Sequence, residues 1–285
     1  MYSIQKICVC GAGTMGSGIA QLTAFAGYPT ILFDTNALVI QQGRQAIQNN
    51  LALLVAKGKI QAEQQLQCLG NIHFTSLQTD CVADLVIEAI VENAAIKKTL
   101  FEQLSLLNAP STIFASNTSS ISIAAMEAAL KTKNPLIGMH FFNPAPVMKL
   151  VEVIKTANTS ETVIRLITAL AKKLGKTPVV CRDSPGFIVN RVARHYYLEA
   201  MKLVEEGHAT IETVDAVLEA TGFKMGPFKL MDLIGMDINF SVSNHVWEAM
   251  GKPLRLQPSA LQKEKIEKNE LGRKTGKGFY TYTNR

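Results

Sequence analysis

Short runs of Val, Ile and Leu alternate with longer stretches of helical periodicity through the first two-thirds of the chain. Parallel strands must be joined by crossover connections, usually helices, so this alternation predicts an α/β domain with a largely parallel sheet. Several runs are almost continuous in apolar residues, as is typical of strands buried on both faces. The expected strands span 6–10, 30–33, 72–74, 85–88, 112–116 and 136–140, and 150–154 and 178–181 could extend the sheet.

The pattern changes after Asp183, where mainly helical periodicity replaces the alternation. The tripeptide Ser184-Pro185-Gly186 can cap and start a helix. The segment 187–206 then carries apolar residues on much of its circumference, as does a helix buried in a core or in a subunit interface. We therefore expect two domains, an α/β domain of residues 1–184 and an all-helical domain of residues 185–285.

A glycine-rich segment, 11–16, joins the first expected strand to a helical run, 17–26. Gly11 permits a tight turn, Gly13 lets the backbone approach a pyrophosphate, and Gly16 permits close packing of helix on strand. A glycine-rich turn without a ligand is the alternative, but the strand–turn–helix context favours a Rossmann-type dinucleotide site. The residues expected to line this site are Gly11, Gly13, Thr14, Met15 and Gly16.

Asp34 ends the second expected strand, where a carboxylate can accept hydrogen bonds from the hydroxyls of an adenosine ribose. The same carboxylate would repel a 2′-phosphate. Two like charges about 4 Å apart interact by about 4 kcal/mol at an effective dielectric near 20, which is roughly a thousandfold in affinity. We therefore expect the cofactor to be NAD rather than NADP.

Two further groups of polar residues should emerge at the carboxyl edge of the sheet, where open α/β folds bind ligands. The serine and threonine residues of 116–120 follow one expected strand, although such a cluster is often a helix cap. His140 ends the next strand, where a structural histidine is the alternative to a functional one.

Glu152 strengthens the functional interpretation of His140. An acid between aliphatic residues of an expected strand is costly to bury unless it is paired, and His140 is the obvious partner. A carboxylate bonded to one ring nitrogen fixes the tautomer and stabilises the imidazolium, so the other nitrogen could take a proton from an alcohol. Sequence spacing alone does not establish this contact.

The chain carries, in order, the motifs GAGTMGSGIAQ, VIEAIVEN, SNTSSISI, GMHFFNPAPVMKLVEVI, DSPGFIVNR and LGRKTGKGFY. Together these motifs resemble one enzyme family, the L-3-hydroxyacyl-CoA dehydrogenases, which include the short-chain 3-hydroxybutyryl-CoA dehydrogenases. The resemblance covers essentially the whole chain. It implies a Rossmann-type NAD domain, a helical domain that commonly mediates dimerisation, and reversible oxidation of (S)-3-hydroxyacyl-CoA, expected to be short-chain, to 3-oxoacyl-CoA.

The resemblance also implies roles for individual residues. His140 would be the general base for oxidation, and Glu152 would orient it. Ser119 would hydrogen-bond the reacting oxygen of the substrate, and Asn190 would hold substrate and histidine in register. Beside Asp34 and the glycine segment, the residues expected near NAD are Glu92, Lys97, Asn117, Ser119, Asn143 and Lys274.

Binding of the CoA moiety is expected to involve Lys57, which looks like the lysine that similar enzymes direct at CoA. A basic helix end favoured by the helix dipole is the equally supported alternative. Asn50 is a weaker candidate. The chain departs from the commonest family pattern at Lys224 and Lys229, where proline and glutamate are frequent. This departure leaves the catalytic set intact, but the details of the acyl pocket do not follow from the resemblance.

Composition and charge narrow the possible partners. The chain of 285 residues is 47% hydrophobic and 18% charged, as ordinary globular proteins are. Its formal charge of +6 is scattered, with no block that reads as a nucleic-acid arm, so a solvated basic surface is the favoured interpretation. A phosphate-bearing small molecule would use the same charge locally. The first expected strand begins close to Met1, which leaves no room for a targeting peptide, and no apolar run could span a bilayer. A cytoplasmic protein is expected.

The cysteines have neither the number nor the spacing of a disulfide framework or a zinc site, so no metal is expected. Cys8 and Cys10 alternate along one expected strand and should point to the same face. Core packing in a reducing compartment is the simplest interpretation of all five cysteines, which are Cys8, Cys10, Cys68, Cys81 and Cys181.

Two other functions are compatible with these residues. The same dinucleotide site and proton relay would serve an NAD-dependent dehydrogenase of a free hydroxy acid or sugar acid, and dependence on CoA would distinguish the two. A non-catalytic structural or NAD-sensing protein could share the scaffold, because fold alone does not establish function. An NADH absorbance assay would separate the enzymes from the non-enzyme.

Overall fold

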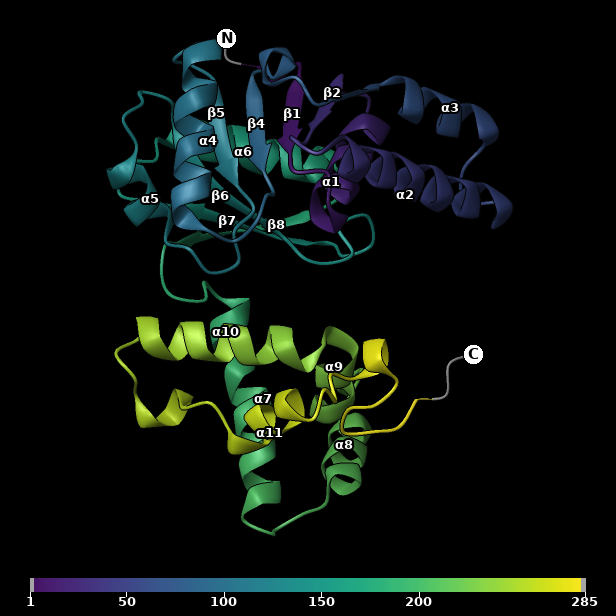
Figure 1. Ribbon diagram of the computed structural model, residues 1–285, viewed down its shortest axis with the longest axis vertical. Coiled ribbons are helices and arrows are strands. Elements are labelled where there is room, and N and C mark those ends of the chain that lie inside the picture. Colours follow the sequence, from purple (N-terminus) through teal and green to yellow (C-terminus); the bar gives the residue numbers. More distant parts are fainter. Residues whose placement is uncertain (1–2, 283–285) are drawn as a thin grey trace. The chain divides into compact units, whose positions relative to one another are not determined.

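The computed structural model describes residues 3–282, and the chain forms two units, Met1–Asp183 and Ser184–Arg285 (Figure 1). The first unit contains the sheet, and the second consists of helices and the turns between them. This is the predicted fold class, a Rossmann-type α/β domain followed by a helical domain. Among the described residues, no helix has the length and apolar character needed to cross a membrane.

All eight expected strands are present in one sheet. Neighbouring strands are parallel except for the antiparallel pair β6 and β7. The order is β3-β2-β1-β4-β5-β6-β7-β8, so the chain switches direction across the sheet between β1 and β4. The strands are β1 Ile7–Cys10, β2 Thr30–Phe33, β3 Ile72–Thr75, β4 Leu85–Glu88, β5 Ile113–Ser116, β6 Leu136–Phe141, β7 Leu150–Lys155 and β8 Thr177–Arg182.

Helices cover both faces of the sheet, which explains the nearly continuous apolar strands. On one face, Ile7 and Val9 of β1 share a core with Ile19 of α1 and Ile167 of α6. On the other face, the ring of Phe101 in α4 stacks on Phe114 of β5 at 5.1 Å between centroids. The helices of this unit are α1 Thr14–Phe25, α2 Ala37–Ala56, α3 Ala62–Gly70, α4 Ala94–Leu107, α5 Ile123–Ala129 and α6 Glu161–Lys173, with the 3-10 turn η1 Gln78–Asp80.

The second unit packs its helices around a core that includes Tyr197, Met201, Phe228 and Met231. Buried Asp232 fastens the C-terminal segment to this core, because its carboxylate accepts hydrogen bonds from the backbone of Phe279 and Tyr280 and from the hydroxyl of Tyr282, each at 2.9 Å. The helices are α7 Val189–Glu205, α8 Ile211–Ala220, α9 Pro227–Ile234, α10 Met236–Ala249 and α11 Ala260–Glu267, with the short turns η2 Leu254–Leu256 and η3 Arg273–Thr275.

The expectation that Ser184-Pro185-Gly186 starts a helix was wrong. Gly186 and Phe187 have φ angles of 71° and 48°, which a right-handed helix cannot include. The segment instead forms a turn, in which the N–H of Phe187 donates to the carbonyl of Ser184 at 2.9 Å, and α7 begins only at Val189.

Candidate active site

The glycine segment forms a tight turn between β1 and α1, at the point where the sheet order switches. Gly11 has φ 99°, and its N–H donates to the carbonyl of Phe33 at 2.7 Å. A Cβ atom on Gly16 would lie 1.7 Å from the carbonyl oxygen of Gly11, so the helix can pack this closely only with glycine there. A Cβ on Gly13 would meet no protein atom within 4 Å, which leaves this side of the turn open to a ligand.

Two hollows lie beside the turn, and Gly13 lines both. The first has mainly apolar walls from the end of β4 and from α4, together with the carboxylate of Asp34, a combination that suits an adenosine. Asp34 accepts hydrogen bonds from the N–H groups of Ala12 and Asn36, each at 2.9 Å. The helix α1 begins at Thr14, and its N-cap, Gly13, provides no side chain to cap the first N–H groups, so the residues around the turn fit NAD.

The second hollow includes Thr14, Asn50 and Asn143. Asn143 is exposed in the segment that follows β6, and the side chain of Asn50 contacts Gln21 of α1 at 3.5 Å. Lys57, by contrast, is the exposed C-cap of α2, two helical turns beyond Asn50, and it is not among the residues that line this hollow. The structure brings Asn50 and Asn143 together but leaves Lys57 at the helix end.

His140 and Glu152 are direct cross-strand partners in the antiparallel pair β6 and β7. The Nδ1 atom of His140 lies 2.8 Å from Oε2 of Glu152, and the two side chains are 7% and 1% exposed. The ring of Phe142 packs on His140 at 4.5 Å between centroids. Such a carboxylate holds the imidazole in one orientation and stabilises its protonated form, so Nε2 can exchange a proton with a bound alcohol or ketone.

Lys97 is buried against two carboxylates. Its Nζ atom lies 2.6 Å from Oε1 of Glu88 and 3.0 Å from Oε2 of Glu92. Glu88 also accepts a hydrogen bond from Ser116 Oγ at 2.6 Å, and burial raises the pKa of this acid against the attraction of Lys97. Glu88 was not predicted as a site residue, although it is an acid at the end of an apolar strand, the same kind of pattern that singled out Glu152.

The segment that carries Ser119 is organised by Glu92. One carboxylate oxygen of Glu92 accepts hydrogen bonds from Thr118 Oγ1 at 2.6 Å, from the N–H of Ser119 at 3.1 Å and from Ser120 Oγ at 2.8 Å. Burial alone would raise the pKa of Glu92, but Lys97 and these hydrogen bonds outweigh it and hold the pKa below its ordinary value. The ion pair is thus coupled to the position of Ser119.

Asn117 connects the ends of β5 and β6, since its Oδ1 atom accepts a hydrogen bond from the N–H of Phe141 at 2.8 Å. Because β5 and β6 are parallel, Ser119, which follows β5, and His140, near the end of β6, lie at the same edge of the sheet. The structure brings Ser119, Asn117, Glu92 and Lys97 together at the carboxyl ends of β4 and β5. Their roles towards NAD and substrate stay predictions.

Two expected site residues belong to the second unit. Asn190 is the second residue of α7, and its carbonyl accepts a hydrogen bond from Nε of buried Arg194 at 3.1 Å. Lys274 forms an ion pair with Asp237, with 2.6 Å between Nζ and Oδ2. Their expected contacts with substrate and NAD stay predictions. Lys229, a departure from the family pattern, pairs with Glu219 at 2.9 Å.

Comparison with known proteins gives a consistent result along the whole chain. A family model described as "3-hydroxyacyl-CoA dehydrogenase, NAD binding domain" matches residues 6–184, and one described as "3-hydroxyacyl-CoA dehydrogenase, C-terminal domain" matches residues 186–282. A 3-hydroxyadipyl-CoA dehydrogenase of Escherichia coli is 43% identical over 99% of this chain, but the match covers only 60% of that longer protein.

Other similar proteins match over their full length. A probable 3-hydroxybutyryl-CoA dehydrogenase of Deinococcus radiodurans is 42% identical over 98% of this chain and 100% of its own. The crystal structure of an (S)-3-hydroxybutyryl-CoA dehydrogenase from Ralstonia eutropha superposes with a TM-score of 0.94 at 36% identity, covering 99% of this chain and 100% of the other.

Proposed function

The chain belongs to the 3-hydroxyacyl-CoA dehydrogenase family, and from this membership we propose that it catalyses the reversible oxidation of a short-chain (S)-3-hydroxyacyl-CoA to the 3-oxoacyl-CoA. Its first domain is the NAD-binding domain of the family. NAD supplies the hydride acceptor when bound. The observation that carries the proposal is the buried contact between His140 and Glu152 at the edge of the sheet that also bears the glycine turn.

In this mechanism His140 takes the proton of the substrate hydroxyl during oxidation and returns it during reduction. Glu152 keeps the imidazole oriented and stabilises its positive charge. Ser119 hydrogen-bonds the reacting oxygen, and Asn190 keeps substrate and histidine aligned. The residues that would hold NAD are Gly11, Gly13, Thr14, Met15, Gly16, Asp34, Glu92, Lys97, Asn117, Ser119, Asn143 and Lys274.

Loss of NADH absorbance with acetoacetyl-CoA tests this function. We expect turnover by the intact protein, and a fall in kcat of about 10²- to 10⁴-fold in His140→Gln, because general acid–base help is worth about that much. NADH binding should be kept. Glu152→Gln should impair the same step, and the double variant should lose less than the product of the two single losses, since the residues act as a unit.

His73→Gln is the matched control, because His73 also pairs with an acid, Asp80, but is exposed and lies on β3. Wild-type turnover by His140→Gln would remove the proposed role. Turnover of free 3-hydroxybutyrate at the rate of its CoA ester would favour the dehydrogenase of a free hydroxy acid, and no turnover of either would favour a non-catalytic NAD-binding protein.

For the CoA moiety we propose contacts from Lys57 and Asn50. Asn50 is supported by its position in the hollow beside the glycine turn. Lys57 is supported by its exposed positive charge at the end of the same helix, which suits a phosphate.

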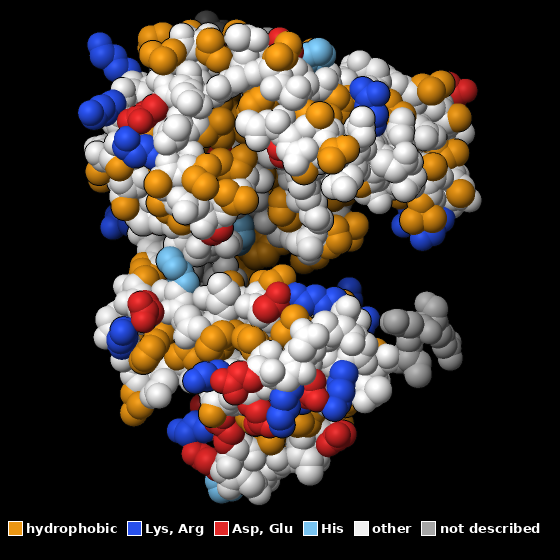
Figure 2. Space-filling view, in the orientation of Figure 1, with side chains coloured by type: hydrophobic (Ala, Val, Ile, Leu, Met, Phe, Trp, Pro, Cys, Tyr) orange, Lys and Arg blue, Asp and Glu red, His pale blue; other side chains and the backbone are white. Residues whose placement is uncertain are grey.

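We also propose that the protein is a homodimer formed through the helical domain. Exposed apolar side chains of this domain support the proposal, including Val192 of α7, Leu233 of α9 and Ile238 of α10, which are 65%, 49% and 51% exposed. Figure 2 shows hydrophobic side chains over the α10 region of this unit. Such surfaces are typical of subunit interfaces.

Sedimentation should give twice the chain mass, and Val192→Glu combined with Ile238→Glu should shift the protein towards monomer. Leu106→Glu is the control, because Leu106 is 86% exposed on the first unit. A monomeric wild-type protein would contradict this proposal without affecting the proposed chemistry.

We also propose that the protein is located in the cytoplasm. All five cysteines are free thiols, which is typical of proteins in a reducing compartment.

A further inference from the structure

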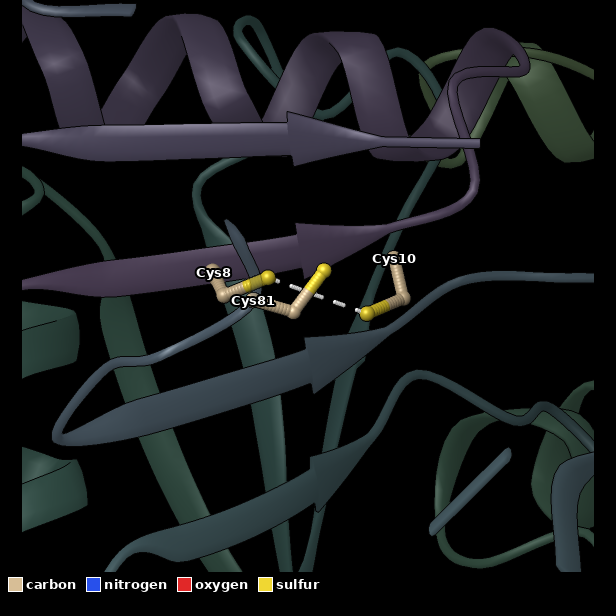
Figure 3. Close-up of side chains that lie close together, drawn as sticks. All are labelled: Cys8, Cys10 and Cys81. Atoms are coloured by element: carbon tan, nitrogen blue, oxygen red, sulfur yellow. Dashed lines mark hydrogen bonds between the residues drawn. The ribbon is translucent and has the colours of Figure 1, made fainter. Parts of the chain in front are cut away.

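Two neighbouring thiols of β1 and a third from a distant part of the sequence meet inside the first unit (Figure 3). Cys8 and Cys10 point to the same face of β1, as predicted, and their sulfur atoms are 3.8 Å apart. Cys81, from the segment between η1 and β4, brings its sulfur to the same place, and the three sulfur atoms all lie within 4.8 Å of one another. Each side chain is fully buried.

The spacing of these sulfur atoms matches the coordination shell of a soft metal ion. Three sulfurs bound at about 2.3 Å around one ion in a plane would lie about 4.0 Å apart. Thiolates are the ligands that soft ions prefer, whereas Mg²⁺ and Ca²⁺ require oxygen ligands. We propose that Cys8, Cys10 and Cys81 form a three-thiolate site for one thiophilic d¹⁰ metal ion such as Cd²⁺, Hg²⁺ or Cu⁺.

Binding exchanges protons for the ion without electron transfer. With a divalent ion, three S–H bonds are broken, three metal–sulfur bonds form and three protons leave to solvent, so the site carries one negative charge. The metal then compensates charge that this apolar interior would otherwise exclude.

The position of the site links it to cofactor binding, a consequence that rests on the proposed function. Cys10 directly precedes Gly11, and its carbonyl accepts a hydrogen bond from the N–H of Ala89 at 2.8 Å, on the wall of the adenosine hollow. Drawing Cys10 towards an ion would therefore move the turn that we propose holds the pyrophosphate. A loaded protein should bind NADH more weakly.

Titration of the reduced, metal-free, full-length protein with Cd²⁺ tests the site. We expect one tightly bound ion per chain, three released protons and an ultraviolet cadmium–thiolate absorption band. Cys81→Ser should lower the Cd²⁺ affinity at least about tenfold, since loss of an outer-shell partner alone typically costs 10- to 100-fold. Cys68→Ser is the control, because Cys68 is also buried but lies in α3, outside the cluster.

The site is overturned if Cys81→Ser binds Cd²⁺ like the wild type, if Cys68→Ser loses the band, or if no ion binds. X-ray absorption of the Cd²⁺-loaded wild-type protein needs no variant, so a misfolded Cys81→Ser cannot obscure the result. Three sulfur neighbours are expected there, and a shell of oxygen or nitrogen atoms would overturn the proposal. These readouts do not depend on enzyme activity, so they are separate from the test of the proposed function.

Discussion

Glu88 and Lys97 illustrate how single buried charges shape the candidate site. Both are almost fully buried, and their charged atoms are 2.6 Å apart. Removing one partner of a buried pair typically costs about 3–5 kcal/mol, because the other charge is left unpaired in a medium of low polarity. Lys97 also forms an ion pair with Glu92, and Glu92 accepts a hydrogen bond from the backbone N–H of Ser119. A buried charge that is not expected to contact substrate, such as Glu88, can therefore help to position Ser119, which is proposed to contact it.

Asp34 gives a prediction at the same scale. Asp34→Ala should weaken NADH binding and narrow the preference for NADH over NADPH by up to roughly a thousandfold, because the repulsion of a 2′-phosphate is lost. Dissociation constants for both cofactors check this. Asp84→Ala is the control, since Asp84 also accepts backbone hydrogen bonds, from Gln5 and Lys6, but at the amino end of β1. An intact protein that prefers NADPH would contradict the argument.

At the scale of elements, the packing of α1 on β1 depends on Gly16. Gly16→Ala would place a Cβ atom against the carbonyl of Gly11, so α1 must shift, and we expect both stability and NADH affinity to fall. Overpacking of this kind typically costs about 1–3 kcal/mol. Urea unfolding and NADH titration measure the two effects.

Gly13→Ala is the matched comparison, because its Cβ atom would meet no protein atom within 4 Å. We expect this variant to keep the stability of the wild type and to lose NADH affinity, since the methyl group takes the space proposed for the pyrophosphate. Equal stability of Gly16→Ala and Gly13→Ala would show that helix packing does not require glycine at position 16.

At the scale of the whole molecule, each unit has its own network of buried polar groups. In the helical unit, Asp215 accepts hydrogen bonds from the N–H groups of Phe228 and Lys229 at the start of α9, and from the hydroxyl of Tyr280. Arg194 donates to Asn239 and Ser243 of α10, each at 2.9 Å, and burial lowers its pKa to about 10. These contacts fix the α7 segment that contains Asn190.

Acid should weaken the helical unit partly through Glu270. Lys265 and Lys277 lower the pKa of this acid from an ordinary value of 4.5 to about 2. Because the pKa of Glu270 is lower in the folded state, its ionised form stabilises the fold at pH values above the ordinary pKa of 4.5. This contribution is lost as the pH falls towards 2. Glu270→Gln should therefore lower the melting temperature at pH 7, and the difference from the wild type should vanish near pH 2.

Glu267→Gln is the control for this pH series. Glu267 is exposed and forms only a 3.8 Å contact with Lys263, so its loss should change the melting temperature little at any pH. A difference between wild type and Glu270→Gln that persists unchanged to pH 2 would contradict the assigned role of Glu270.

The sequence by itself determined the strands, the glycine turn and the identities of the paired acid and histidine. Continuous apolar runs, glycine at fixed positions and an acid among aliphatic residues are local patterns, and local patterns can be recognised without knowing the fold. Only the tertiary structure decided which distant residues meet. The antiparallel register aligns His140 with Glu152, and strand order brings Cys81 to β1.

The start of α7 was mispredicted for a related reason. The left-handed backbone at Phe187 is uncommon for a bulky residue, and no local sequence pattern predicts it. Local residue preferences act over a few positions, whereas register, burial and backbone strain depend on contacts between segments far apart along the chain.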